Sequence, residues 1–151
     1  MSEIHIDDFE LPATGGTPFT LAAQRGKKVV VYFYPKDDTS GCTIEGQEFT
    51  ALHEEFKHAN TVIVGVSRDD LKSHERFKAK FGFAFELLSD VDEKICEQFG
   101  VMKLKNLYGK QVRGVERSTF VFDTRGQLVK AWRGLKAPGH AAEVLDFVQS
   151  L

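Results

Sequence analysis

The sequence predicts an α/β fold, a three-layer sandwich in which helices flank a central mixed sheet. Two continuous apolar runs, at 28–34 and 61–66, are typical of parallel strands that are covered on both faces. A helical pattern lies between the two runs, as the crossover between parallel strands requires. A turn signal at 123–126 between two short strand patterns adds an antiparallel hairpin, which makes the sheet mixed.

The first half of the chain alternates between strand and helix patterns. Its predicted elements are an extended region at 4–6 and 9–11, a turn at 15–16, a short strand at 18–21, a central strand at 28–34, a helix at 43–56 and a second long strand at 61–66. The helix is predicted from a rough apolar face that consists of Ile44, Phe49, Leu52 and Phe56.

The second half contains clearer signals for where helices start and stop. Its predicted elements are a helix capped by Asp69 or Asp70 that runs through Phe77 and Phe81, a short strand at 86–88, a helix from Asp90 through Phe99, a hairpin with strands at 118–122 and 127–132, and a closing helix at about 139–151. Gly82 and Gly100 follow the last apolar residues of their helices, which is where glycine commonly ends a helix.

Length, composition and charge predict one globular domain over residues 1–151. The net charge of −2 is spread along the chain, so we expect no nucleic-acid partner and no membrane partner. Residues 1–5 lack the basic and apolar regions of a signal peptide, which predicts a cytoplasmic protein. The two cysteines are then expected to be reduced thiols instead of a disulfide framework.

The stretch 35–42 predicts a reactive cysteine. It follows the buried strand and precedes the helix, so Cys42 lies where a strand ends and a helix begins. Free backbone N–H groups and the helix dipole favour an anion at such a point, and therefore favour the thiolate. A cysteine kept for packing would more often lie inside the strand or on the apolar helix face. We therefore interpret Cys42 as a nucleophile.

These residues resemble a known signature. The pattern Pro-x-x-x-Thr-x-x-Cys at Pro35, Thr39 and Cys42 resembles that of peroxiredoxins, thiol peroxidases with a thioredoxin-like fold. Residues 34–45 are similar to the bacterioferritin comigratory protein subfamily, also called peroxiredoxin Q. The resemblance covers nearly the whole chain, and it includes 88–90, 116–120, 123–126 and 139–141.

The resemblance implies an antioxidant enzyme of cell redox homeostasis. Its substrates would be hydrogen peroxide and alkyl hydroperoxides, and its product a sulfenic acid on Cys42 that a thiol such as thioredoxin or glutaredoxin/glutathione reduces. The resemblance also implies that Arg117 lies beside Cys42, that the Thr39 hydroxyl positions the peroxide and that Pro35 shields the sulfur. No cofactor and no metal are implied, and we expect a monomer.

Each of these residues also has a simpler interpretation. Arg117 taken alone would be a surface charge before a strand, and Pro35 would only end one. Thr39 or Ser40 is expected to occupy the N-cap position in either case. We interpret Glu45, one turn into the helix, as a favourable charge near its positive end instead of a catalytic group.

The chain departs from the subfamily at the second cysteine. Many members have it five residues after the first, where this chain has Gln47, and others have it on the next helix, where 72–81 contains none. The remaining thiol is Cys96, whose helix context indicates a packing role. We therefore expect one-cysteine catalysis with an external thiol, while a two-cysteine peroxidase that uses Cys96 as the resolving cysteine remains an alternative.

Other classes of function fit the sequence less well. A Cys–His hydrolase needs a base beside the nucleophile, and no pairing signature is recognisable around His5, His53, His58, His74 or His140. No cluster of cysteine and histidine has the spacing of metal ligands. The serious alternative is a peroxide sensor or binding module that is oxidised at Cys42 without turnover.

Overall fold

The strand order confirms the predicted mixed sheet. The computed structural model describes residue 6 and residues 8–151, so the predicted extended segment at 4–5 lies outside the described residues. In the described chain the central sheet has five strands in the order β5-β4-β3-β8-β9. These strands are β3 (Lys28–Phe33), β4 (Thr61–Ser67), β5 (Glu86–Ser89), β8 (Ser118–Phe122) and β9 (Leu128–Arg133). The pairs β3–β4 and β4–β5 are parallel, whereas β3–β8 and β8–β9 are antiparallel.

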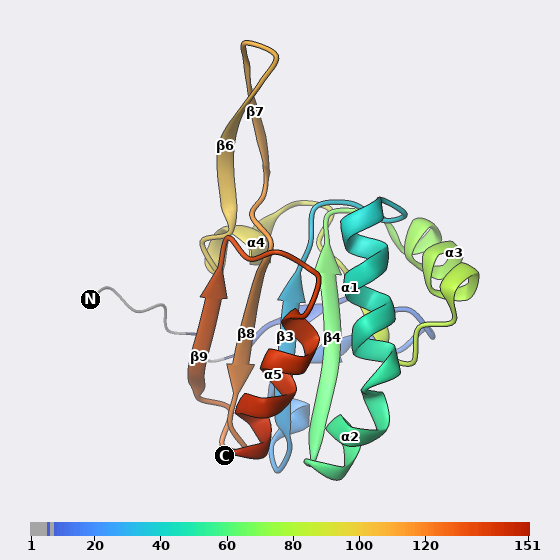
Figure 1. Cartoon of the computed structure of the whole chain (residues 1–151), viewed down its shortest axis with the longest axis vertical. Coiled ribbons are helices and arrows are strands. Elements are labelled where there is room, and N and C mark those ends of the chain that lie inside the picture. Colours follow the sequence, from blue (N-terminus) through green and yellow to red (C-terminus); the bar gives the residue numbers. More distant parts are fainter. Residues whose placement is uncertain (1–5, 7) are drawn as a thin grey trace.

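Helices cover both faces of this sheet, as the three-layer prediction requires (Figure 1). They are α1 (Ser40–Ala51), α2 (His53–His58), α3 (Leu71–Phe81), α4 (Lys94–Gln98), α5 (His140–Gln149) and a 3₁₀ turn, η1 (Ala22–Gln24). Among the described residues, no helix has both the length and the apolar character needed to cross a membrane.

Alternation along β3 divides the apolar core into two parts. Val31 and Phe33 point to one face, where α4 and the small hairpin of β1 (Glu10–Leu11) and β2 (Phe19–Thr20) contribute the covering side chains. Val30 and Tyr32 point to the other face, which α1, α2, α3 and α5 cover. The predicted turn at 15–16 lies between β1 and β2 and is confirmed.

The prediction of one helix over 43–56 is wrong. The helix α1 begins at Ser40, and Leu52 leaves helical geometry at φ −101° and ψ 8° before α2 starts. Phe49 and Phe56 are both fully buried on either side of this break. Because α1 begins earlier than predicted, Cys42 lies within its first turn.

The start of α4 also differs from the prediction, and the structure gives the reason. The helix begins at Lys94 after a turn, and the Asp90 carboxylate accepts hydrogen bonds from the backbone N–H groups of Ile95 (3.2 Å) and Cys96 (2.7 Å). Asp90 therefore caps the helix from a position before the turn. The predicted limits of α3 are confirmed, since Asp70 caps it at Ser73 (2.9 Å) and Gly82 ends it at φ 65°.

A further hairpin, β6 (Met102–Leu107) and β7 (Lys110–Val115), is absent from the predicted elements and extends away from the sheet (Figure 1). Its two turn residues, Tyr108 and Gly109, have φ values of 53° and 79°. Positive φ at both positions is typical of the type I′ turn, for which Asn-Gly or Asp-Gly is the usual sequence signal. Tyr-Gly lacks that signal, which explains why the hairpin was missed.

At Gly46 an aromatic side chain packs directly against α1. A Cβ atom added there would lie 2.4 Å from Cζ of Phe83, so the aromatic ring rests directly against the helix backbone. Phe83 is 4% exposed and stacks on Phe85, with their ring centroids 5.7 Å apart. The glycine therefore has a packing role, whatever its cost in helix propensity.

We predict that Gly46→Ala lowers the free energy of unfolding by about 1–2 kcal/mol. The methyl group adds about 1 kcal/mol of helix propensity, but overpacking typically costs up to about 3 kcal/mol, and the ring atoms here lie well inside contact distance. Urea denaturation followed by circular dichroism measures the change. Gly114→Ala is the control, because nothing lies within 4 Å of its added Cβ. A more stable Gly46→Ala protein would contradict this packing argument.

Candidate active site

Cys42 lies buried at the positive end of α1. It follows Thr39, which occupies the N-cap position with extended backbone at φ −104° and ψ 158°. The first backbone N–H groups of a helix have no acceptor within the helix, so they remain available to an anion. Cys42 is only 2% exposed and belongs to the same apolar core as Tyr32 and Phe49. The sulfur is therefore held at a helix start and mostly shielded from water.

The Arg117 guanidinium connects this sulfur to a carboxylate. Arg117 lies immediately before β8, and its Nη2 donates to the Sγ of Cys42 at 3.4 Å. Its Nη1 donates to Oε1 of Glu45 at 2.6 Å. Gly41 permits this approach, since a Cβ at that position would lie 2.9 Å from Nη2. The structure thus brings together two residues that are 75 positions apart in the sequence.

Glu45 is a buried member of this group, so its interpretation as a simple helix-end charge is wrong. Its side chain is fully buried, and Oε2 has no hydrogen-bond partner among the described residues. Burial raises the pKa of Glu45 to about 7, against the opposing effect of the Arg117 charge and hydrogen bond. Burial opposes the charge on Arg117, but its neighbours Glu45 and Cys42 outweigh it and raise the Arg117 pKa.

Thr39 and Pro35 border the site. The Thr39 hydroxyl does not cap α1; it donates instead to the backbone carbonyl of Lys36 at 2.8 Å. Thr39 is exposed, and Pro35 is half-buried directly after the fully buried Tyr34. The roles of both residues in positioning and shielding stay predictions.

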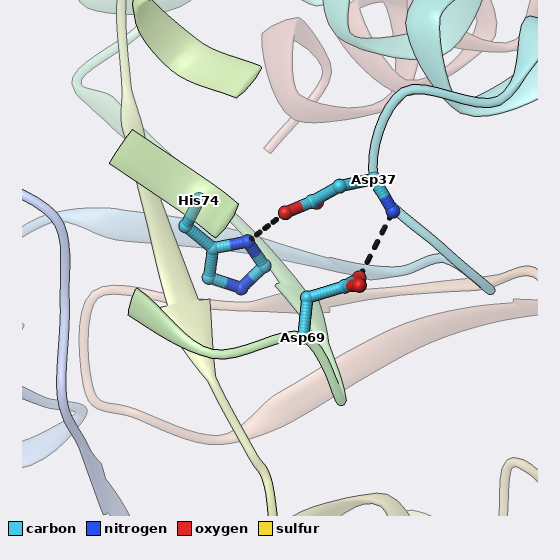
Figure 2. A group of neighbouring side chains, drawn as sticks. All are labelled: Asp37, Asp69 and His74. Atoms are coloured by element: carbon cyan, nitrogen blue, oxygen red, sulfur yellow. Dashed lines mark hydrogen bonds and ion pairs between the residues drawn. The ribbon is translucent and has the colours of Figure 1, made fainter. Parts of the chain in front are cut away.

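A second polar group, which the sequence reasoning missed, holds the loop before Cys42. Figure 2 shows Asp37 of this loop directed toward His74 of α3 and Asp69. His74 is fully buried, and its Nδ1 lies 2.7 Å from Oδ2 of Asp37. Asp37 follows β3 and Asp69 follows β4, and the carboxyl ends of neighbouring parallel strands meet at one sheet edge. That placement is the signal that could have revealed the group.

Cys96 belongs to the other core. It is fully buried on α4 and packs with Phe33 and Phe99, whereas Cys42 packs on the opposite face of the sheet. Burial, followed by the neighbouring Asp90 carboxylate, raises the pKa of the Cys96 thiol. Both cysteines are free thiols. The central sheet therefore separates the two sulfur atoms.

Known proteins are similar to this chain in sequence and in fold. Residues 4–131 match the AhpC/TSA family. Peroxiredoxin Bcp of Xanthomonas campestris is 56% identical over 145 residues, which are 95% of this chain and 91% of the relative. Peroxiredoxin Bcp of Bacillus subtilis is 44% identical over 144 residues, 95% and 92% of the two chains.

Solved structures agree with these sequence relatives. Peroxiredoxin Q of Xanthomonas campestris superposes with a TM-score of 0.90 at 54% identity, covering 94% of this chain and 90% of the other. Peroxidoxin BcpB of Mycobacterium tuberculosis superposes with a TM-score of 0.86 at 34% identity, covering 97% and 95%. This chain therefore belongs to the AhpC/TSA family and, within it, to the Bcp/PrxQ peroxiredoxins, which are thiol peroxidases.

Proposed function

We propose that this peroxiredoxin reduces hydrogen peroxide and alkyl hydroperoxides at Cys42 by a one-cysteine mechanism, with an external thiol as reductant. The observation that carries the proposal is the 3.4 Å contact between Nη2 of Arg117 and Sγ of Cys42. Alkyl hydroperoxides are included because a structural study of the Xanthomonas campestris relative, 54% identical to this chain, concerns alkyl peroxide reduction.

The first step is attack of the Cys42 thiolate on one peroxide oxygen. An S–O bond forms, the O–O bond breaks, and the departing oxygen takes a proton and leaves as water or an alcohol. The sulfur is oxidised to a sulfenic acid and the peroxide is reduced by the same two electrons. Arg117 stays protonated, so it can stabilise both the thiolate and the negative charge that develops on the leaving oxygen.

The Thr39 hydroxyl supports this step as an acceptor. Its proton is committed to the Lys36 carbonyl, so its oxygen is left to accept a hydrogen bond from the O–H of the peroxide. The backbone N–H groups at the start of α1, including that of Cys42, would face the second peroxide oxygen. Pro35 would keep water from the sulfur. Thr39 would thus position the peroxide and Pro35 would exclude water, while Arg117 would stabilise the negative charge.

The second step needs a thiol from outside the chain. The thiol condenses with the sulfenic acid to a mixed disulfide and water, and a second thiol then releases Cys42 and a disulfide product. The burial of Cys42 requires the first turn of α1 to open before a thiol can reach the sulfur. A small thiol such as glutathione, or a thioredoxin or glutaredoxin, has the chemistry for this step.

The separation of the cysteines supports the one-cysteine mechanism. A disulfide needs Cα atoms within about 7 Å, and here Cys42 and Cys96 belong to cores on opposite faces of the central sheet. Joining them would therefore require the fold to open locally. The Gln47 position, where many relatives carry the second cysteine, has no thiol.

We further propose that residues 1–151 form one domain that acts as a monomer in the cytoplasm. Cys42, Glu45 and Arg117 all come from one chain, so the catalytic group needs no second copy. Two free thiols are the state that a reducing compartment maintains.

Replacing Cys42 with Ser tests the proposed function. We expect the wild-type protein to consume many equivalents of hydrogen peroxide in the presence of excess thiol, and Cys42→Ser to consume none, because the hydroxyl is not ionised at neutral pH. Peroxide loss measures the turnover, and circular dichroism checks the fold. Turnover in Cys42→Ser would refute the assignment. A wild-type protein that is oxidised once and then stops would indicate a sensor instead of an enzyme.

Replacing Cys96 with Ser tests the one-cysteine mechanism. We expect peroxide consumption with an external thiol to stay within about a factor of two of the wild-type rate, since a buried cysteine of this kind contributes packing. Peptide mapping after one equivalent of peroxide should find Cys42 oxidised and not joined to Cys96. A Cys42–Cys96 disulfide in high yield within one chain would make this a two-cysteine enzyme.

A further inference from the structure

A buried polar cluster lies beside the active-site loop, which we define as residues 35–42. It consists of Asp37, Asp69 and His74, and we call it the loop anchor (Figure 2). Its members come from three places in the fold: the active-site loop itself, the segment after β4 and the helix α3. Asp37 is 7% exposed, His74 is fully buried and Asp69 is half-buried, so the anchor extends from the interior toward the surface.

The hydrogen bonds around His74 tie the loop to α3. Its Nε2 lies 2.9 Å from the Leu88 carbonyl and its Nδ1 lies 2.7 Å from Oδ2 of Asp37. A carbonyl can only accept, so Nε2 carries a proton, and a further proton is shared between Nδ1 and the carboxyl group. Asp37 also accepts from the hydroxyls of Tyr34 (2.6 Å) and Ser73 (2.8 Å). The carboxyl group is therefore held from three directions.

The three side chains have the composition of a metal site, and their ligand atoms lie within 4.8 Å of one another. However, both nitrogens of His74 and both carboxyl oxygens of Asp37 already take part in hydrogen bonds. The anchor is therefore complete as a hydrogen-bonded structural unit.

The anchor reaches Thr39 through a single peptide group. The N–H of Asp37 donates to Oδ2 of Asp69 at 2.9 Å, and the carbonyl of the same peptide, on Lys36, accepts from the Thr39 hydroxyl at 2.8 Å. Because a peptide group is planar and trans, its N–H and C=O point in opposite directions. Asp69 is fixed in turn by the Ser67 hydroxyl at 2.5 Å. Holding the N–H toward Asp69 thus aims the carbonyl at Thr39.

We propose that the loop anchor is a positioning device for peroxide attack. Asp69 holds the N–H of the Lys36–Asp37 peptide, the Asp37–His74 contact holds the loop against α3, and the carbonyl of that peptide thereby orients the Thr39 hydroxyl. The inference rests on the proposed function, in which Thr39 accepts from the peroxide. Without the anchor the Lys36 carbonyl is still present, but it is no longer held in the direction that fixes the proton of the Thr39 hydroxyl. The hydroxyl then rotates, and the peroxide is no longer aligned with the sulfur.

A double-mutant cycle on the second-order rate constant for Cys42 oxidation by hydrogen peroxide tests this route. Asp37→Ala and Thr39→Val should each lower the constant by up to about 10²-fold, the effect of a misplaced reacting group. If the anchor acts through Thr39, adding Asp37→Ala to Thr39→Val should cost no more than about threefold further. Losses that simply multiply in the double variant would overturn the inference. If Asp37→Ala does not fold, His74→Gln replaces it in the same double-mutant cycle.

Two matched variants separate positioning from other effects. Lys80→Ala removes an exposed ion pair with Asp38 (2.8 Å) that also joins this loop to α3, and it should stay within about twofold of wild type. Asp37→Asn keeps a donor for Nδ1 of His74 and an acceptor for Tyr34, so it should recover most of the rate lost in Asp37→Ala. An Asn variant as slow as the Ala variant would indicate a charge effect and contradict the anchor. A wild-type protein inert to peroxide would instead refute the proposed function.

Discussion

The site depends on one shared cation. The Arg117 guanidinium contacts Sγ of Cys42 with one nitrogen and Oε1 of Glu45 with another, so a single positive charge serves two groups that can both become negative. The fork of arginine fits this arrangement because its donors diverge in one plane. Gly41 leaves the space, and the buried carboxylate fixes the fork. Burial raises the pKa of this carboxyl group to about 7, against the effect of the Arg117 charge.

The fold places this interaction at the end of the sheet where β3 ends and β8 begins, and on one face of the sheet. The strand β3 leads into the loop and the first turn of α1. Its antiparallel neighbour β8 begins directly after Arg117, so the two strands bring Arg117 and Cys42 to the same end of the sheet. Asp37 of the loop and His74 of α3 add a second buried polar group, which is satisfied by its own hydrogen bonds. The same sheet places Cys96 among apolar side chains of the opposite face.

Sequence patterns predict the elements that depend on interactions between residues close together in the chain. The apolar runs of β3 and β4, the Asp70 cap and the glycine that ends α3 follow from periodicity and capping. The place of Arg117 came from family resemblance, since nothing near it in sequence points to Cys42. Sequence patterns lead to the wrong interpretation of Glu45 and do not reveal His74, because their partners lie 72 and 37 residues away and a sequence without contacts shows neither burial nor pairing.

The most direct test of the shared cation is the rate constant for oxidation of Cys42 by hydrogen peroxide in Arg117→Ala and Arg117→Lys. The account predicts a loss of about 10²–10³-fold for alanine, the usual effect of removing one such donor. Lysine should restore only part of it, because one ammonium group keeps the charge but not the fork that reaches Glu45 and the sulfur together. An Arg117→Ala protein that folds and reacts within about twofold of the wild-type rate would contradict the account, since that small a change is far below the loss of a transition-state donor.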